Sequence, residues 1–224
     1  MNIHEAMQQR HSVRQYTDAP LSADAAQQLV GYVGECNQLS GMHLQLVLGD
    51  TKAFGGFRRL IIKNAANYLA VVGPDDSALD YSSGYWGEKV VLRAKQLGVD
   101  SCWFSMGAKK GSVEILPGEK MRIVVVLGYG AVPGTPHQSK PSTELCANES
   151  GDELPEWFVQ GIEAALLAPT ARNQQKFCFT LLPHRTVRAE SLGGPFSDID
   201  LGIACCHFEI GAGKENFSWA DRID

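Results

Sequence analysis

The sequence lacks a surplus of basic charge, which argues against binding to nucleic acid. It has 20 lysines and arginines against 25 acidic residues, so the formal net charge is −5. A protein that grips DNA or RNA through phosphate contacts presents a clustered basic surface. We therefore expect no nucleic-acid partner.

Long apolar runs are also missing. No stretch approaches the roughly 18 consecutive apolar residues of a membrane-spanning helix. The first five residues contain neither the basic nor the apolar region of a secretory signal peptide. These absences predict a soluble, cytoplasmic protein with no membrane partner.

The six cysteines include no Cys-x-x-Cys pair, and most of them lie inside apolar segments. This usage is typical of reduced, buried thiols in a cytoplasmic protein. A zinc site built from Cys205, Cys206 and His207 is conceivable, but these adjacent positions are poorly spaced for tetrahedral ligation. We therefore predict no metal site.

Hydrophobic periodicity in this chain of 224 residues predicts several helices and strands. A length of this order suits one domain, or two small intertwined halves. The expected helices cover about 23–36, 57–65, 84–97, 155–167 and 197–212, and the expected strands and turns cover 42–48, 68–72, 102–107, 123–127 and 177–182. In the helix expected after Gly55 and Gly56, the apolar residues Phe57, Leu60 and Ile61 would share one side.

The segment 10–14, Arg-His-Ser-Val-Arg, alternates two arginines and a serine. In an extended segment Arg10, Ser12 and Arg14 would point to one face. Two guanidinium groups with a hydroxyl between them suit a phosphate monoester. An exposed basic segment without function is the alternative interpretation.

The segment 168–177, Ala-Pro-Thr-Ala-Arg-Asn-Gln-Gln-Lys-Phe, joins a helix to a strand. Pro169 ends the helix because it biases the preceding residue away from helical geometry. Thr170, Asn173 and Gln175 place neutral hydrogen-bonding groups on this turn, and such groups can recognise a flat heteroaromatic ring. An ordinary polar turn is the alternative.

Gly128-Tyr129-Gly130 follows an apolar strand, as the start of a dinucleotide-binding fingerprint would. That fingerprint needs a helix immediately after the glycines. Pro133, Pro136 and Pro141 follow instead, and they exclude a helix there. The sequence therefore does not predict a Rossmann fold.

Both polar segments resemble motifs of the FMN-dependent nitroreductase family. Pro169, Thr170, Asn173 and Gln175 are similar to its "A-P-S-x-x-N-x-Q" segment, which lies against the flavin ring, although Thr170 stands in place of serine. Residues 10–14 are similar to its "R-x-S-x-R" segment, which holds the FMN phosphate and ribityl chain. The resemblance implies FMN binding by both segments.

Two further regions are implied by the resemblance alone. The strand and turn after the helix at 84–97 correspond to a segment whose backbone approaches the flavin edge, and one of Ser105, Met106 or Gly107 would lie there. The proline-rich segment after Gly130 would deliver a basic side chain to the phosphate, and Lys140 is the candidate. A solvated loop lysine is the alternative for Lys140.

The order of elements repeats along the chain, which suggests two related halves. We expect a first half at 1–141 with the phosphate-binding signature, a connector at 142–153, and a shorter second half at 154–224 with the flavin-ring segment. Nitroreductases are intertwined dimers, so the repeat predicts a pseudo-dimer in one chain that could function as a monomer. The expected fold is α+β, nitroreductase-like, with a mainly antiparallel sheet flanked by helices.

The resemblance implies an oxidoreductase that uses FMN and NAD(P)H. It would reduce a small electrophilic acceptor, such as a nitroaromatic or a quinone, by a ping-pong mechanism in which the cofactor carries the chemistry. We nominate no catalytic side chain. The alternative is a protein that binds flavin, or none, and keeps the fold for storage, sensing or interaction.

Overall fold

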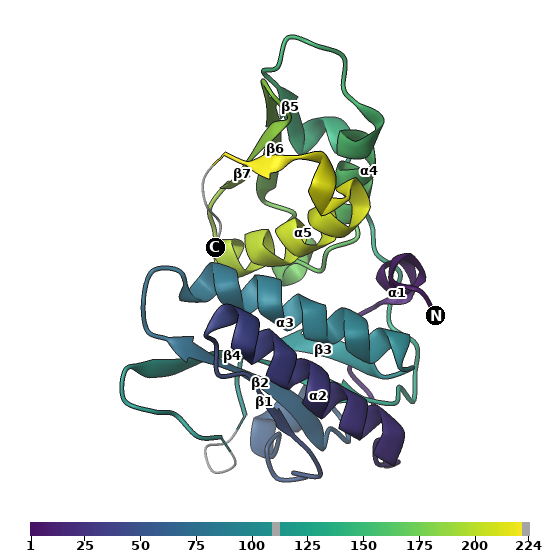
Figure 1. Ribbon diagram of the computed structural model, residues 1–224. Helices are drawn as coiled ribbons and strands as arrows, with labels where there is room; N and C mark the ends of the chain where they lie inside the picture. Colours follow the sequence, from purple (N-terminus) through teal and green to yellow (C-terminus); the bar gives the residue numbers. More distant parts are fainter. Residues whose placement is uncertain (109–112, 221–224) are drawn as a thin grey trace. The chain divides into compact units, whose positions relative to one another are not determined.

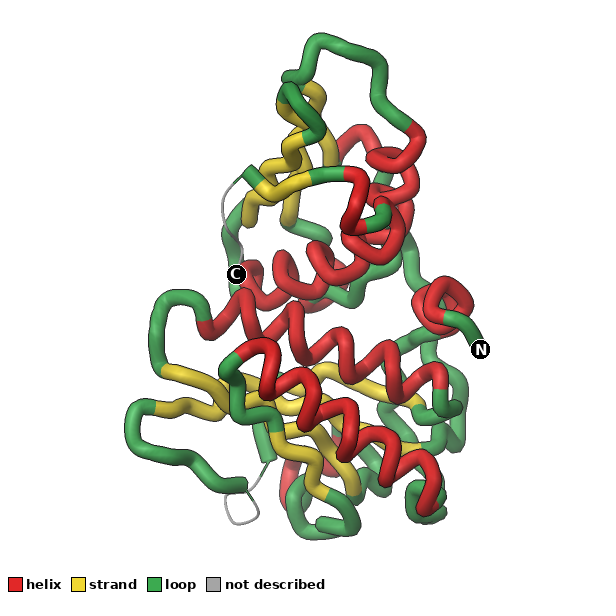
Figure 2. The backbone as a smooth tube through the Cα atoms, in the orientation of Figure 1, coloured by secondary structure: helices red, strands yellow, loops and turns green. Residues whose placement is uncertain are grey.

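The computed structural model describes residues 1–108 and 113–220, and it divides into two compact units, Met1–Pro136 and His137–Asp224. Each unit contains its own four-stranded sheet and its own pair of packed helices (Figures 1 and 2). The predicted α+β class is therefore confirmed. The last four residues of the half expected at 154–224 lie outside the described ranges.

The helices of the first unit begin at recognisable capping residues. Its helices are α1 (Ile3–Gln9), α2 (Ala23–Ser40) and α3 (Leu79–Gln96). Asn2 and Glu5 form a reciprocal capping box at the start of α1, a helix that the sequence analysis missed. The Ser22 side chain caps α2 by accepting from the Ala25 N–H.

The sheet of the first unit is antiparallel throughout, in the order β1-β2-β4-β3. Its strands are β1 (Gln45–Val47), β2 (Asn67–Pro74), β3 (Asp100–Phe104) and β4 (Glu119–Gly128). Alternate residues of a strand face opposite sides of a sheet. Both inner strands, β2 and β4, are buried over most of their length, as predicted from their apolar runs.

The two faces of this sheet have different covers. Helix α3 packs on β2, β3 and β4, and α2 packs on α3, so the two helices lie side by side in Figures 1 and 2. One buried cluster joins strand residues Tyr68, Cys102 and Val124 to Val13 and Phe54. Irregular segments around residues 13–16 and 53–65 therefore contribute to the core.

The prediction of a helix at 57–65 is wrong. Only a 3₁₀-helix forms there, at Gly56–Leu60, and Phe57 and Leu60 are 58% and 83% exposed. The backbone of Lys63 forms hydrogen bonds outside any helix: its N–H donates to the Arg14 carbonyl, and its carbonyl accepts from the Tyr16 N–H. Pairing with the N-terminal segment therefore replaces the hydrogen bonds that a helix would have made.

The second unit has a mixed sheet in the order β5-β6-β7-β8. Its elements are β5 (Cys146–Asn148), α4 (Glu156–Ala165), β6 (Phe177–Leu182), β7 (Thr186–Ser191), α5 (Ser197–Ala212) and β8 (Ser218–Trp219). Strands β5 and β6 are parallel, β6 and β7 antiparallel, and β7 and β8 parallel. The segment expected to be a connector thus contributes β5 to this sheet.

Helices α4 and α5 approach each other closely. A Cβ atom added at Gly161 would lie 2.6 Å from the Phe208 ring, and one added at Gly211 would lie 2.4 Å from the Ala164 Cβ atom. The Phe208 ring in turn stacks on Phe179 of β6, with the ring centroids 4.6 Å apart. His207 is fully buried in α5, and its Nδ1 atom lies 3.2 Å from the Ala164 carbonyl oxygen.

The two units share an order of elements. In the first unit α2, β1, β2, α3 and β3 follow one another, and in the second α4, β6, β7, α5 and β8 do. Strand β3 runs parallel to β2, since both are antiparallel to β4, and β8 likewise runs parallel to β7. No described strand of the second unit takes the place of β4, so β8 pairs directly with β7.

Within residues 1–108 and 113–220, no helix combines the length and apolar character needed to cross a membrane. The same residues contain no cluster of three or more His, Cys, Asp or Glu side chains arranged to hold a metal ion.

Candidate functional site

The segment 10–14 is held in an extended conformation beside β3. Helix α1 ends at Gln9, and Ser12 forms a parallel bridge with Ser101 of β3. The Val13 N–H donates to the Ser101 carbonyl at 2.9 Å, and the Val13 side chain is buried. Val13 therefore anchors the extended segment to this part of the core.

Arg10, Ser12 and Arg14 all act on one side chain, the Cys102 thiol of β3. Burial raises the pKa of this thiol, while the charges of Arg14 and Arg10 and a hydrogen bond with Ser12 oppose that rise. All three side chains therefore influence the same thiol, although Arg10 is buried and Arg14 is exposed. Whether they hold a phosphate remains a prediction.

Arg10 and Arg14 differ in their surroundings. Arg14 is exposed, whereas Arg10 is only 4% exposed. The Arg10 Nε atom lies 3.8 Å from Glu88 Oε1 of α3, beyond hydrogen-bond distance, and is buried without a hydrogen-bond partner. Burial lowers the pKa of Arg10, and the Glu88 carboxylate opposes that shift. The guanidinium group therefore has a nearby counter-charge but incomplete hydrogen bonding.

The turn that follows β3 contains Ser105, Met106 and Gly107, the residues implied for the flavin edge. Ser105 and Met106 are exposed, and Gly107 has a left-handed backbone with a φ of 63°. The Arg58 Nε–H group donates to the carbonyls of Met106 and Gly107 at 3.2 and 3.0 Å. Arg58 therefore holds this turn in place.

The segment 168–177 forms a tight turn with an unusual backbone. Helix α4 ends at Ala165, and a short 3₁₀ turn follows at Ala171–Asn173. Arg172, Asn173 and Gln175 all have positive φ values, between 46° and 56°. Side chains other than glycine rarely adopt this region, and clusters of such residues are typical of functional sites.

The polar side chains of this turn hold the segment at 137–140. Gln175 is 2% exposed; its Oε1 atom accepts from the Lys140 N–H at 2.9 Å, and its Nε2 atom donates to the Gln138 carbonyl at 3.0 Å. The Asn173 Nδ2 group donates to the same carbonyl at 2.8 Å, and Thr170 Oγ1 accepts from the Gln175 N–H at 3.0 Å. The structure therefore brings together four predicted residues, including Lys140.

These contacts give Gln175 a structural role that the sequence analysis did not foresee. Both ends of its buried amide are occupied by backbone groups of residues 138 and 140. Asn173 is exposed and Thr170 is half-buried. Recognition of a flavin ring remains a prediction for all three, and it would have to use the atoms that these bonds leave available.

A buried carboxylate, Asp200 in the first turn of α5, holds the other side of the same turn. It is 3% exposed, and its two oxygens lie 2.9 and 3.0 Å from the Ala171 N–H nitrogen. The Gln174 Nε2 group donates to Asp200 Oδ2 at 2.6 Å. Burial raises the pKa of Asp200 to about 6, although both hydrogen bonds lower it. No sequence motif had indicated this residue.

The comparisons with known proteins agree with the fold. The family model described as "Putative TM nitroreductase" matches residues 2–212. A "putative nitroreductase" from Thermotoga maritima is similar in structure, with 21% identity and a TM-score of 0.69 over 96% of this chain and 85% of that chain. No curated protein matches the sequence.

Shorter relatives match part of the chain. A nitroreductase family protein from Streptococcus pneumoniae has 14% identity and a TM-score of 0.51, covering 64% of this chain and 98% of its own. A "putative nitroreductase in complex with FMN" from Desulfovibrio desulfuricans has 16% identity and a TM-score of 0.50, covering 64% and 94%. These similarities show a shared fold. Together with the family match over residues 2–212, they lead to one conclusion: the chain belongs to the nitroreductase family.

Proposed function

We propose that this protein is an FMN-dependent oxidoreductase that uses NAD(P)H to reduce a small electrophilic acceptor, such as a nitroaromatic or a quinone. One observation carries the proposal: Arg10, buried 3.8 Å from Glu88, has an Nε–H group without a hydrogen-bond partner, and Ser12 and the exposed Arg14 follow it on the same extended segment. Family membership and the FMN complex of the Desulfovibrio relative support it.

The residues present fit a flavin phosphate. The exposed guanidinium of Arg14 and the hydroxyl of Ser12 can donate to phosphate oxygens, and the positive charge of buried Arg10 adds to the attraction. Glu88 neutralises part of that charge, so Arg14 is expected to make the stronger direct contact. Lys140, tied to Gln175, offers a further cation.

Bound FMN would supply the hydride-transfer chemistry between NAD(P)H and the acceptor in a ping-pong cycle. The residues of this chain would bind FMN and orient it. Backbone groups at Ser105, Met106 and Gly107 are expected to line the flavin edge, and the bonds from Arg58 keep that turn in one conformation. A fixed backbone dipole stabilises developing charge without reorganisation.

The test of this function is reduction of the bound cofactor. Protein saturated with FMN is mixed anaerobically with NADH or NADPH, and the visible absorbance of the flavin is followed before and after menadione or a nitroaromatic is added. Bleaching by a nicotinamide and recovery on addition of the acceptor are expected. A protein that stays yellow with both nicotinamides would instead be a non-catalytic flavin binder.

We also propose that one chain carries a single complete set of flavin-binding residues, as an internal pseudo-dimer in the cytoplasm. The recurring order of helices and strands in the two units supports this idea. The Arg-x-Ser-x-Arg signature occurs only in the first unit, and the 168–177 segment only in the second.

The pseudo-dimer predicts that a monomer binds FMN. Light scattering coupled to size exclusion, at low micromolar concentration, is expected to show flavin absorbance on a species of 24.4 kDa. Binding of one FMN per chain in that species would agree with the proposal. Flavin that elutes only with a dimer would contradict the pseudo-dimer and leave the family assignment intact.

A further inference from the structure

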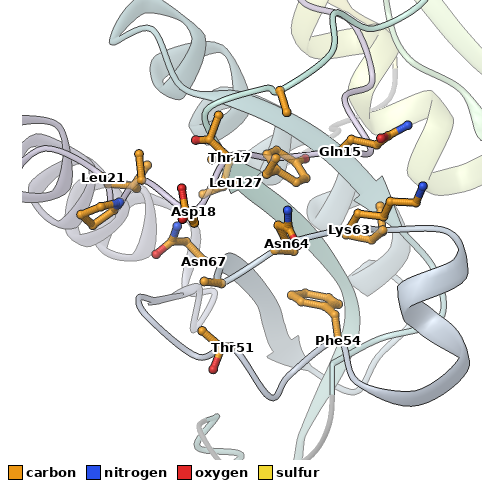
Figure 3. A pocket seen from close by; sticks show the side chains of 18 of the residues that line it. Gln15, Thr17, Asp18, Leu21, Thr51, Phe54, Lys63, Asn64, Asn67 and Leu127 are labelled. Atoms are coloured by element: carbon orange, nitrogen blue, oxygen red, sulfur yellow. The ribbon is translucent and has the colours of Figure 1, made fainter.

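A pocket of about 840 Å³ opens in the first unit, beside the end of β4 and the start of β2 (Figure 3). Its volume lies within the range of small-molecule sites. Arg10, Ser12, Arg14 and the 105–107 turn do not line it. This pocket is therefore a separate feature from the proposed flavin-binding residues, and no part of the proposed function accounts for it.

The interior of the pocket is apolar and rigid. Phe54, Ile62 and Leu127 line it, and each is at most 2% exposed. The Phe54 ring is fixed by edge-to-face contacts with Tyr68 and Phe104, whose centroids lie 5.4 and 5.9 Å away. An apolar floor of this kind favours a hydrophobic or aromatic ligand body, because the ligand's own apolar area leaves water when it packs there.

Polar groups with unused hydrogen-bonding capacity converge on the same pocket. Thr17 Oγ1 is buried and has no hydrogen-bond partner among the described residues. Asn67 is 7% exposed, and its Oδ1 atom accepts from the Gly49 N–H at 3.1 Å. Figure 3 shows Asn64 and Thr17 beside this space. A buried hydroxyl without a partner is costly, so a ligand that bonds to it gains affinity.

The charges of the lining favour an anion. Arg59 and Lys63 are its cationic side chains and Asp18 its single acidic one, although the chain as a whole has a net charge of −5. Arg59 and Lys63 are exposed, so their heads can reach a ligand at the mouth of the pocket. A cation would meet two like charges there and a single opposite one.

We propose that this pocket binds a small aromatic carboxylate. The ring system lies against Phe54, Ile62 and Leu127, and the carboxylate lies near Lys63 and Arg59. The Thr17 hydroxyl donates a hydrogen bond to the ligand. The site is independent of FMN, because it shares none of the predicted flavin-binding residues.

Isothermal titration of the full chain, saturated with FMN, tests the proposal with three probes of one shape: 2-naphthoate, 2-naphthamide and 2-naphthylmethylamine. The carboxylate is expected to bind about 2- to 5-fold more tightly than the amide, as for an exposed ion pair, and the amine is expected to bind most weakly. Tightest binding by the amine would overturn the assignment.

Two variants locate the binding. Thr17→Val is expected to weaken 2-naphthoate about 3- to 10-fold, and Lys63→Met about 2- to 5-fold. Lys120→Met, an exposed lysine of β4 outside the lining, is the matched control and should leave the affinity unchanged. Binding of 2-naphthoate that neither pocket variant alters, or no binding at millimolar probe, would refute the proposal.

A second measurement separates a binding role of Thr17 from a structural one. Valine has nearly the same shape and removes a buried hydroxyl that lacks a partner. The ligand-free melting temperature of Thr17→Val is therefore expected to equal or exceed that of the wild type. A loss of both stability and affinity would assign the hydroxyl to the fold.

Discussion

Replacing Arg14 with alanine is expected to weaken FMN binding about 10- to 150-fold, since a hydrogen bond to a charged group contributes roughly 1.5–3 kcal/mol. Riboflavin lacks the phosphate, so its affinity should hardly change. Arg14 is exposed, and its loss should leave the fold intact. Quenching of flavin fluorescence on titration with protein measures both affinities.

A matched control is Arg93→Ala on α3, where the lost guanidinium hydrogen-bonds to Gln28 instead of facing Cys102. Its affinities for FMN and riboflavin should equal those of the wild type. If Arg14→Ala lowers both affinities by the same factor, the phosphate is held elsewhere.

Arg10 needs a different design, because Arg10→Ala would remove the positive charge that lies 3.8 Å from the fully buried Glu88 carboxylate. Breaking a buried pair in this way costs about 3–5 kcal/mol. The double variant Arg10→Met, Glu88→Gln removes both charges and keeps an acceptor for the Trp103 Nε1–H group. It is expected to recover much of the stability while binding FMN more weakly than the wild type.

Local patterns can indicate only those parts of the candidate site that lie close together in the sequence. The alternation of Arg10, Ser12 and Arg14 indicated a shared face, and all three side chains act on Cys102. Glu88 could not be found in this way, because it reaches Arg10 from a helix 78 positions further along the chain. The bonds from Arg58 to the carbonyls of Met106 and Gly107 are equally non-local.

In the fold, too, elements with clear local sequence signals were predicted, whereas elements without them were missed. Strand 177–182 and helix 197–212 agree with β6 and α5 at both ends, because apolar residues and flanking turn residues mark them clearly. Strand β7 was missed because His184 and Arg185 form its turn with φ values of 60° and 56°. Asn-Gly or Asp-Gly is the usual signature of such a hairpin turn.

The Asp200 carboxylate combines burial with a structural role in the second unit. It is buried, and it holds the backbone of Ala171 and the side chain of Gln174 in a turn whose neighbours have strained φ values. Burial raises its pKa from 3.8 to about 6. The folded protein therefore binds this proton more tightly than the unfolded chain does.

This shift fixes the sign of a pH dependence. Where the folded state holds more protons, stability falls as pH rises. The contribution of Asp200 should therefore decline between about pH 4 and about pH 6, and the cost should be complete above about pH 7. One pKa unit corresponds to 1.36 kcal/mol, so the whole cost is about 3 kcal/mol.

Asp200→Asn is expected to remove this cost, because the amide stays neutral and its oxygen can still accept from the Ala171 N–H. We expect the variant to be more stable than the wild type by about 1–3 kcal/mol near pH 7, and to lose the advantage near pH 4. The lower figure applies if Gln174 must reorient, since its Nε2 group now donates to Asp200. Urea unfolding at a series of pH values measures the difference.

The control is Asp198→Asn, two residues earlier in the first turn of α5, where the carboxylate is exposed. An acidic side chain near a helix N-terminus stabilises the helix by about 0.3–1 kcal/mol, so this variant should be slightly less stable at neutral pH. The two substitutions thus remove the same charge from the same helix end with opposite expected signs. If Asp200→Asn is also destabilising at neutral pH, the hydrogen bonds to Ala171 and Gln174 outweigh the desolvation of the carboxylate, and the pKa of Asp200 is not raised.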